Sequence, residues 1–227
     1  MTKTAVITGA RKGIGHELAK MFVEMGWRVF GTTRDNDITC KTVDGITYLI
    51  DVEHSFDYCA TSEVDVLINN AANSSDWVPG VSHTPFLDME EHDFEWQMID
   101  NVVIPIANIQ NLYRGKRFGT GARIVNVVSG VGEFSHPDAF KDFQAGYATS
   151  KCALIMATKK IAAALQPHGI YCNAACPGWC KTDMGGPDAP RTAREGAESI
   201  LKACFLDVET PPTGLYFRDG HRIKIEG

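Results

Sequence analysis

The sequence predicts a doubly wound α/β fold with a mainly parallel sheet. Short apolar runs alternate with longer segments whose apolar residues recur at helical spacing, which is the pattern of repeated β-α-β units. A glycine-rich segment joins the first apolar run to the first helical segment. The length of 227 residues suits one α/β domain, so we expect residues 1–227 to form a single domain.

The first β-α unit is the clearest. Residues 4–7 are expected to form a strand, and a helix follows that ends at Gly26. One face of this helix is apolar through residues at helical spacing, namely Ile14, Leu18, Met21, Phe22 and Met25.

The remaining elements follow in the same rhythm. Strands are expected at residues 28–32, 47–50, 64–68, 123–128, 170–176 and 214–217, and helices at residues 98–112 and 147–165. Several of these strands are almost wholly apolar, as strands covered on both faces of a parallel sheet should be. Residues 177–194 are rich in Gly, Pro and Asp and follow a strand, so they predict a lid beside the carboxyl ends of the strands.

Charge and hydropathy exclude several kinds of protein. The net charge of −6 argues against a nucleic-acid-binding face, because phosphate binders carry a basic excess. No apolar run has the length of a membrane span, and the N-terminal residues have no signal-peptide pattern. A cytoplasmic protein without nucleic-acid or membrane partners is therefore expected.

The seven cysteines do not predict a metal site. Cys172, Cys176 and Cys180 have a metal-like spacing, but two of them flank a buried strand and no histidine lies nearby to complete a zinc set. We expect free thiols in the core and no bound metal.

The glycine-rich segment reads T-G-A-R-K-G-I-G over residues 8–15. Glycines let the backbone turn tightly and approach a pyrophosphate, and the helix that follows offers free N–H groups to the phosphates. Its position between a strand and a helix favours a Rossmann-type dinucleotide site over a purely structural turn. The residues predicted to contact the cofactor here are Gly9, Arg11, Lys12, Gly13, Ile14 and Gly15.

Tyr147 and Lys151 form the candidate catalytic pair. Residues i and i+4 share one face of a helix, so the phenol and the ammonium would lie side by side. A phenol titrates near ~10, and a neighbouring ammonium lowers that pKa towards the range of a general acid. Ser129 follows an apolar strand and completes the set, although a capping role for Ser129 and a buried polar role for Asn101 stay open.

Several short motifs occur in one order along nearly the whole chain. They are T-G-x-x-x-G-I-G at the first turn, Asp51-Val52, Asn69-Asn70-Ala71-Ala72, Asn101, Ser129, Y-x-x-x-K at Tyr147 and Lys151, and Pro177-Gly178 with Thr182. Together they resemble the classical short-chain dehydrogenase/reductase family, with Ala72 where that family usually has Gly. Residues 177–186 and 215–220 resemble its carbonyl-reductase branch.

The resemblance implies an oxidoreductase that exchanges a hydride between NADP(H) and a carbonyl or alcohol. It implies that Ser129 binds the carbonyl oxygen, that Tyr147 protonates it, that Lys151 holds the ribose hydroxyls, and that Asn101 holds a water. The further cofactor contacts that it implies are Asp51, Val52, Asn69, Ala71, Pro177, Gly178 and Thr182.

NADP is favoured over NAD by the end of the second strand. An acid there would bind the 2′-hydroxyl of NAD, but the chain has Thr33 and then Arg34. Together with Lys12, Arg34 would supply two cations to a 2′-phosphate. Asp35, an acidic residue directly after Arg34, argues against this interpretation.

The substrate is expected to contact three loops, at residues 73–86, 133–146 and 177–194. Their aromatic residues suggest an apolar or aromatic carbonyl compound; they are Trp77, Phe86, Phe134, Phe140, Phe143 and Trp179.

Compared with the family, residues 34–64 are short and residues 133–146 are long. The oligomeric state therefore stays open between a dimer and a tetramer. Two other functions stay open, a non-catalytic NADP-sensing protein on the same fold and a lyase or epimerase of more distant relatives.

Overall fold

A nine-stranded sheet organises the chain, in the strand order β3-β4-β2-β1-β5-β6-β7-β8-β9. The computed structural model describes residues 2–34, 37, 41–50, 63–75, 84–139, 141–142, 144–206 and 211–224. All pairings from β4 to β8 are parallel, and the edge strands β3 and β9 pair antiparallel. The predicted doubly wound, mainly parallel fold is confirmed.

The strands and helices have the following bounds. The strands are β1 Thr4–Ile7, β2 Arg28–Thr33, β3 Thr42–Val43, β4 Ile46–Ile50, β5 Val64–Asn69, β6 Phe118–Val127, β7 Tyr171–Cys176, β8 Tyr216–Arg218 and β9 His221–Ile223. The helices are α1 Gly13–Glu24, α2 Glu91–Met98, α3 Ile104–Arg114, α4 Ala145–Leu165 and α5 Ala193–Cys204, with a π-helical turn η3 at Ile99–Val103. Short 3₁₀ turns are η2 Phe86–Asp88, η4 Gly130–Gly132 and η5 Gln166–His168.

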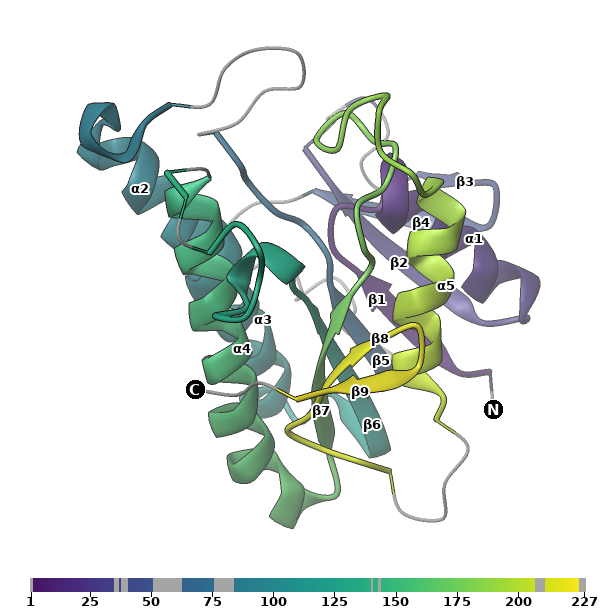
Figure 1. The fold of residues 1–227 in the computed structure, drawn as a ribbon. Coiled ribbons are helices and arrows are strands. Elements are labelled where there is room, and N and C mark those ends of the chain that lie inside the picture. The colour runs from purple at the N-terminus through teal and green to yellow at the C-terminus, as the bar shows by residue number, and fades with distance from the viewer. Residues whose placement is uncertain are drawn as a thin grey trace.

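Helices cover both faces of the sheet. Helices α1 and α5 lie on one face, and α3 and α4 lie on the other (Figure 1). Neighbouring residues of β1 point to opposite faces, so Ile7 packs in the cluster that contains Phe22 of α1, and Val6 packs in the one that contains Leu112 of α3. This three-layer arrangement leaves the sheet uncovered by helices at the carboxyl ends of the parallel strands.

The helix predicted at residues 98–112 is wrong in its bounds and regularity. Helical structure runs from Glu91 to Arg114 and is widened at η3. Pro105 has no N–H to donate to the carbonyl of Asn101, four residues earlier, so a regular α-helix cannot continue through this point. The interruption therefore falls on one of the predicted catalytic residues.

Besides α2 and the short 3₁₀ turns, three elements were not predicted. The helix α5 begins with a capping box, in which the Thr192 side chain accepts from the Glu195 N–H and the Glu195 carboxylate accepts from the Thr192 N–H. The other two are the edge strands β3 and β9, which are two and three residues long. Between β2 and β4 the described residues hold β3 and no helix.

The other predicted bounds shift by a few residues. β6 begins at Phe118 rather than at residue 123, and the last predicted strand lies at Tyr216–Arg218 instead of 214–217. In the part of the chain that the structure describes, no helix is long and apolar enough to cross a membrane.

Candidate active site

The first β-α turn has the geometry of a phosphate-binding turn. Gly9 and Gly13 have φ of +65° and +58°, in the left-handed region that a side chain disfavours. A Cβ on Gly15 would lie 2.2 Å from the Gly9 carbonyl oxygen, so the turn closes tightly only because this residue is glycine. The first turn of α1 carries no acidic residue, which leaves its N-terminal end favourable for an anion.

Gly15→Ala is expected to disrupt this turn. The added methyl group would also lie 2.5 Å from Asn70 Nδ2, and the backbone must move to admit it. We expect a loss of about 1–3 kcal/mol in the free energy of unfolding, together with weaker dinucleotide binding. Thermal unfolding and nucleotide titration measure the two effects. Gly119→Ala is the matched control, because its Cβ would meet the flexible end of Glu63 at 3.3 Å; equal losses in both variants would contradict the special role of Gly15.

Two residues that the sequence analysis did not single out hold the turn in place. The Thr8 hydroxyl accepts from the N–H groups of Asn70 and Ala71, at 2.9 Å each. Asn70 Nδ2 donates to the Thr8 carbonyl oxygen at 2.9 Å. The segment after β5 therefore braces the glycine-rich turn, and the polar pair Asn69-Asn70 next to an apolar strand was the available signal.

Asn69 itself faces the interior. Its side chain is buried, donates to Asn126 Oδ1 at 2.9 Å and to the Pro105 carbonyl oxygen at 3.3 Å, and accepts from Asn108 Nδ2 at 3.0 Å. The Asn69 amide thus joins β5 to β6 and α3, and the predicted cofactor contact of this residue stays a prediction.

Asn101 lies inside the π-helical turn and is fully buried. Its side chain accepts from the backbone N–H of Asn73 at 2.8 Å and donates to the Asn73 carbonyl oxygen at 2.7 Å. It also donates to Ser150 Oγ at 2.9 Å, and Ser150 Oγ donates to the Tyr147 carbonyl oxygen at 2.7 Å. Asn101 thus ties the loop after β5 to the first turns of α4, where Tyr147 lies.

Tyr147 and Lys151 lie together, as their spacing predicted. Lys151 Nζ is 5.5 Å from the centroid of the Tyr147 ring and donates to the Val127 carbonyl oxygen at 2.9 Å. The Lys151 side chain is buried, and this burial lowers the pKa of the amine from 10.5 to about 8. The structure thus places a buried amine beside the phenol ring on one face of α4.

Ser129 leads from the end of β6 into the turn η4. Its backbone is extended, with φ −137° and ψ 150°. A Cβ on Gly132 would lie 2.9 Å from the Lys151 carbonyl carbon, so the turn after Ser129 rests directly on α4 beside the candidate pair Tyr147 and Lys151. The structure therefore brings the segment of Ser129 to the segment of Tyr147 and Lys151.

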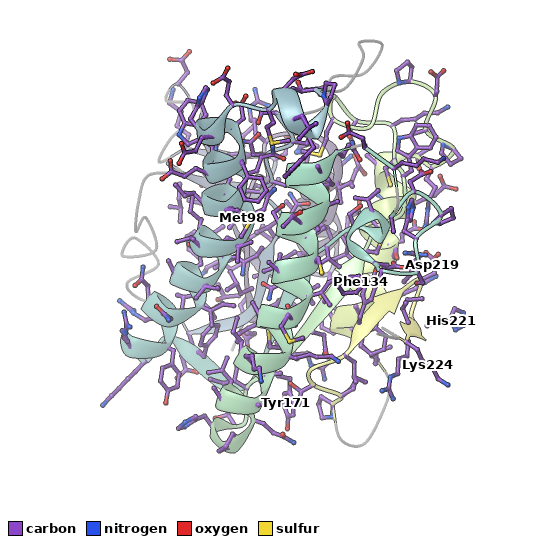
Figure 2. All side chains as sticks on the ribbon, turned by 60° about the vertical axis from the view of Figure 1, so that its left-hand side comes forward. Met98, Phe134, Tyr171, Asp219, His221 and Lys224 are labelled. Atoms are coloured by element: carbon purple, nitrogen blue, oxygen red, sulfur yellow. The ribbon has the colours of Figure 1, made fainter. Side chains whose placement is uncertain are left out.

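The far side of this turn is fixed by β8. Glu133 accepts hydrogen bonds from the Tyr216 hydroxyl and from Arg218 Nη2. Figure 2 shows the same region from the side of α4, with the next residue, Phe134, labelled. The loop after Ser129 is thus held between α4 and β8, a contact that the sequence analysis did not foresee.

The predicted lid lies over the glycine-rich turn. The loop after β7 arches over the same end of the sheet (Figure 1), with Gly178 in the left-handed region at φ +77°. Thr182 Cγ2 lies 3.2 Å from the place of a Cβ on Gly13. Lys12, the residue before Gly13, forms an ion pair with Asp183 of the loop. The loop therefore contacts the glycine-rich turn at both Lys12 and Gly13.

The two cations expected at a 2′-phosphate each have a carboxylate partner. Arg34 Nη2 lies 3.4 Å from Asp100 Oδ2, and Lys12 pairs with Asp183. Asp35, Asp51 and Val52 lie outside the described residues, so their predicted contacts stay predictions.

A family model described as short chain dehydrogenase matches residues 3–192 of the chain. The chain belongs to the short-chain dehydrogenase family. The matched residues include the glycine-rich turn, Asn101, Ser129, the Tyr147–Lys151 pair and the first part of the lid. The predicted resemblance is confirmed, and the protein is an oxidoreductase of this family.

Relatives with this fold come from several bacteria. Protein FixR of Bradyrhizobium diazoefficiens is 35% identical over 203 residues, which cover 82% of this chain and 70% of FixR. The 3-oxoacyl-[acyl-carrier-protein] reductase FabG of Rickettsia prowazekii is 32% identical over 197 residues, which cover 80% of this chain and 74% of FabG. A solved short-chain dehydrogenase/reductase from Burkholderia multivorans, with bound NADP, superposes with a TM-score of 0.81 at 22% identity, covering 99% of this chain and 100% of that one.

Three large aromatic side chains of this short-chain dehydrogenase are exposed. Phe86, Phe134 and Trp179 are 54%, 73% and 52% exposed, and they come from the three loops expected to contact substrate. Trp77, Phe140 and Phe143 lie outside the described residues. The described aromatic residues are thus accessible to an apolar ligand.

The three cysteines with metal-like spacing are buried and form no disulfide. Cys172, Cys176 and Cys180 are free, and burial raises the pKa of Cys180 to about 11. Among the described residues, no three His, Cys, Asp or Glu side chains are grouped so that they could hold a metal ion.

Proposed function

We propose that this protein reduces a ketone or an aldehyde to an alcohol with NADPH, or catalyses the reverse oxidation. The observation that carries the proposal is the buried ammonium of Lys151, 5.5 Å from the ring centroid of Tyr147, with the turn after Ser129 resting against the same segment of α4. The FabG relative is named for the reduction of a carbonyl compound, which supports the same reaction class.

Ser129, Tyr147 and Lys151 have different roles in the proposed reduction. A bound NADPH would supply the hydride. Ser129 donates a hydrogen bond to the carbonyl oxygen as negative charge builds on it. Tyr147 gives its hydroxyl proton to that oxygen, and the Lys151 ammonium stabilises the phenolate that is left and binds the ribose hydroxyls.

Asn101 holds the elements that carry these residues. Its bonds to Asn73 and Ser150 leave the start of α4 fixed relative to the loop after β5. We propose that Asn101 also holds the water that returns protons to Lys151, as in the family. The buried position of Asn101 in a widened helical turn supports such a role.

The cofactor fits the glycine-rich turn and the segments around it. The left-handed glycines, the free N-terminus of α1 and the absence of a side chain at Gly15 suit a pyrophosphate. Pro177, Gly178 and Thr182 on the lid would hold the carboxamide of the nicotinamide. Arg34 and Lys12 would bind the 2′-phosphate, and the NADP in the Burkholderia relative supports this choice.

Arg34→Ala tests the choice of NADP. Charge-assisted hydrogen bonds to a phosphate contribute about 1.5–3 kcal/mol each before solvent screening, so the wild type should prefer NADPH by at least about tenfold. The variant should lose most of that preference through weaker NADPH binding, and added salt should narrow the wild-type gap. The measurement is kcat/KM with each cofactor. Equal use of NADH and NADPH by the wild type would refute the assignment of the two cations.

The substrate is proposed to be apolar or aromatic, as in the carbonyl-reductase branch that residues 177–186 resemble. The exposed rings of Phe86, Phe134 and Trp179 support this class. A panel of aliphatic and aromatic ketones and aldehydes with NADPH, followed by the alcohols with NADP⁺, is the direct test. Binding of NADPH without turnover across the panel would favour a cofactor-sensing protein instead.

A further inference from the structure

Asp100 has partners on two segments, the end of β2 and the loop after β5. Its Oδ2 lies 3.4 Å from Arg34 Nη2 at the end of β2 and accepts from Asn73 Nδ2 at 3.2 Å. Arg34 is the residue assigned to the 2′-phosphate. Asn73 belongs to the loop after β5, which Asn101 holds.

The carboxylate is fixed in this place. Asp100 lies in the π-helical turn directly before the fully buried Asn101, and its side chain is only 19% exposed. Both backbone groups of Asn73 are bonded to the Asn101 side chain, which holds the Asn73 backbone beside Asp100. Asp100 therefore cannot move away from Arg34 without breaking contacts next to the catalytic centre.

The acid that pairs with Lys12 differs from Asp100 in this respect. Asp183 lies on the loop after β7, and its side chain is 77% exposed. That carboxylate can leave Lys12 by turning into solvent, at the cost of an exposed ion pair of small strength. Of these two carboxylates, Asp100 is the one that stays beside the proposed phosphate site.

We propose that Asp100 is a cofactor-selectivity residue that opposes NADPH, because its fixed carboxylate competes with the 2′-phosphate for Arg34 and repels it. NADH carries a hydroxyl at that position and meets no such opposition. The charge of Asp100 thus limits the NADPH preference that Arg34 and Lys12 create. This inference rests on the proposed use of a nicotinamide cofactor and names a further specificity residue of the same site.

Asp100→Asn removes the charge and keeps the shape. The new amide oxygen still accepts from Asn73 Nδ2, so the contact to the active-site loop is preserved. We expect NADPH to bind at least about threefold more tightly than to the wild type and NADH to change by less than about twofold. Dissociation constants are measured by titration with each nucleotide, without substrate. Glu91→Gln in the first turn of α2 is the control for the loss of one negative charge on the same helical segment.

A double variant identifies Arg34 as the shared partner. In an Arg34→Ala background, Asp100→Asn should improve NADPH binding by clearly less than in the wild-type background, because only the direct repulsion remains. An unchanged ratio of NADPH to NADH affinity in Asp100→Asn would overturn the proposal, as would the same gain in both backgrounds or an equal gain in Glu91→Gln.

Turnover is measured separately, so the two proposals can fail separately. If the wild type binds both nucleotides and reduces no carbonyl compound, the proposed reaction fails and the selectivity result still stands. If turnover is found but the affinity ratio does not move, only the role of Asp100 fails.

Discussion

Tyr147→Phe is expected to lower kcat for carbonyl reduction by about 10²–10⁴-fold, the range that a positioned general acid contributes. The variant lacks the proton donor and keeps the ring that lies over Lys151 Nζ. Binding of NADPH should stay within about twofold of the wild type, because the hydroxyl serves the chemistry and the ring serves the packing. Steady-state rates and nucleotide titration on the same preparation give both quantities.

Tyr113→Phe is the matched control. The Tyr113 hydroxyl bonds to His168 Nε2 at 3.0 Å, on α3 and away from the turn after Ser129, so the same loss of one hydroxyl should leave kcat close to the wild type. Substantial turnover in Tyr147→Phe, or an equal loss in both variants, would remove Tyr147 from its proposed role.

The first β-α unit and the catalytic helix could be predicted because their signals are local. A strand, a glycine-rich turn and an amphipathic helix follow one another within residues 4–25, and the spacing of Tyr147 and Lys151 places them on one face of any helix. The structure places both features as expected. Lys151 is more deeply buried than a lysine on a helix surface would be, because η4 and β6 pack over it.

The support around the site could not be predicted, because it depends on contacts between distant segments. Asn101 meets Asn73 and Ser150 across 28 and 49 residues of sequence, and Glu133 meets Arg218 across 85. Nothing in a local pattern distinguishes these polar residues from ordinary turn or cap residues. For the same reason the internal role of Asn69 could not be predicted. Its motif suggests a contact with the cofactor, whereas its side-chain amide joins β5 to β6 and α3.

The break in the helix before α3 had a local signal that was not used. Pro105 lies within a segment that otherwise reads as helical, and a proline inside a helix removes one backbone donor. The chain resolves this with a wider turn and not with an end of the helix. That outcome places Asp100 beside Arg34 and Asn73, and it places the buried Asn101 against Asn73 and Ser150.

Replacement of Lys151 is expected to separate its charge from its packing. Lys151→Met keeps a long apolar stem in the buried site and removes the ammonium, so kcat should fall by about 10²-fold or more and NADPH binding should weaken. The free energy of unfolding at pH 7 should not fall by more than about 1 kcal/mol, because the variant no longer buries a charge. A lower rate with unchanged NADPH affinity would contradict the double role of the amine.

The pH dependence of the wild type follows from the same burial. Because burial lowers the pKa of Lys151 to about 8, the ammonium is present below that pH and is lost as the pH rises through it. Reduction should therefore slow above about pH 8. The folded state binds fewer protons than the unfolded state between about 8 and 10.5, so the contribution of Lys151 to the free energy of unfolding rises with pH in this window. In Lys151→Met this rise in the free energy of unfolding should disappear. Denaturant unfolding at pH 7 and pH 10 measures it, and Lys159→Met, at an exposed position on α4, is the control. A rise of the same size in Lys151→Met would show that another group is responsible.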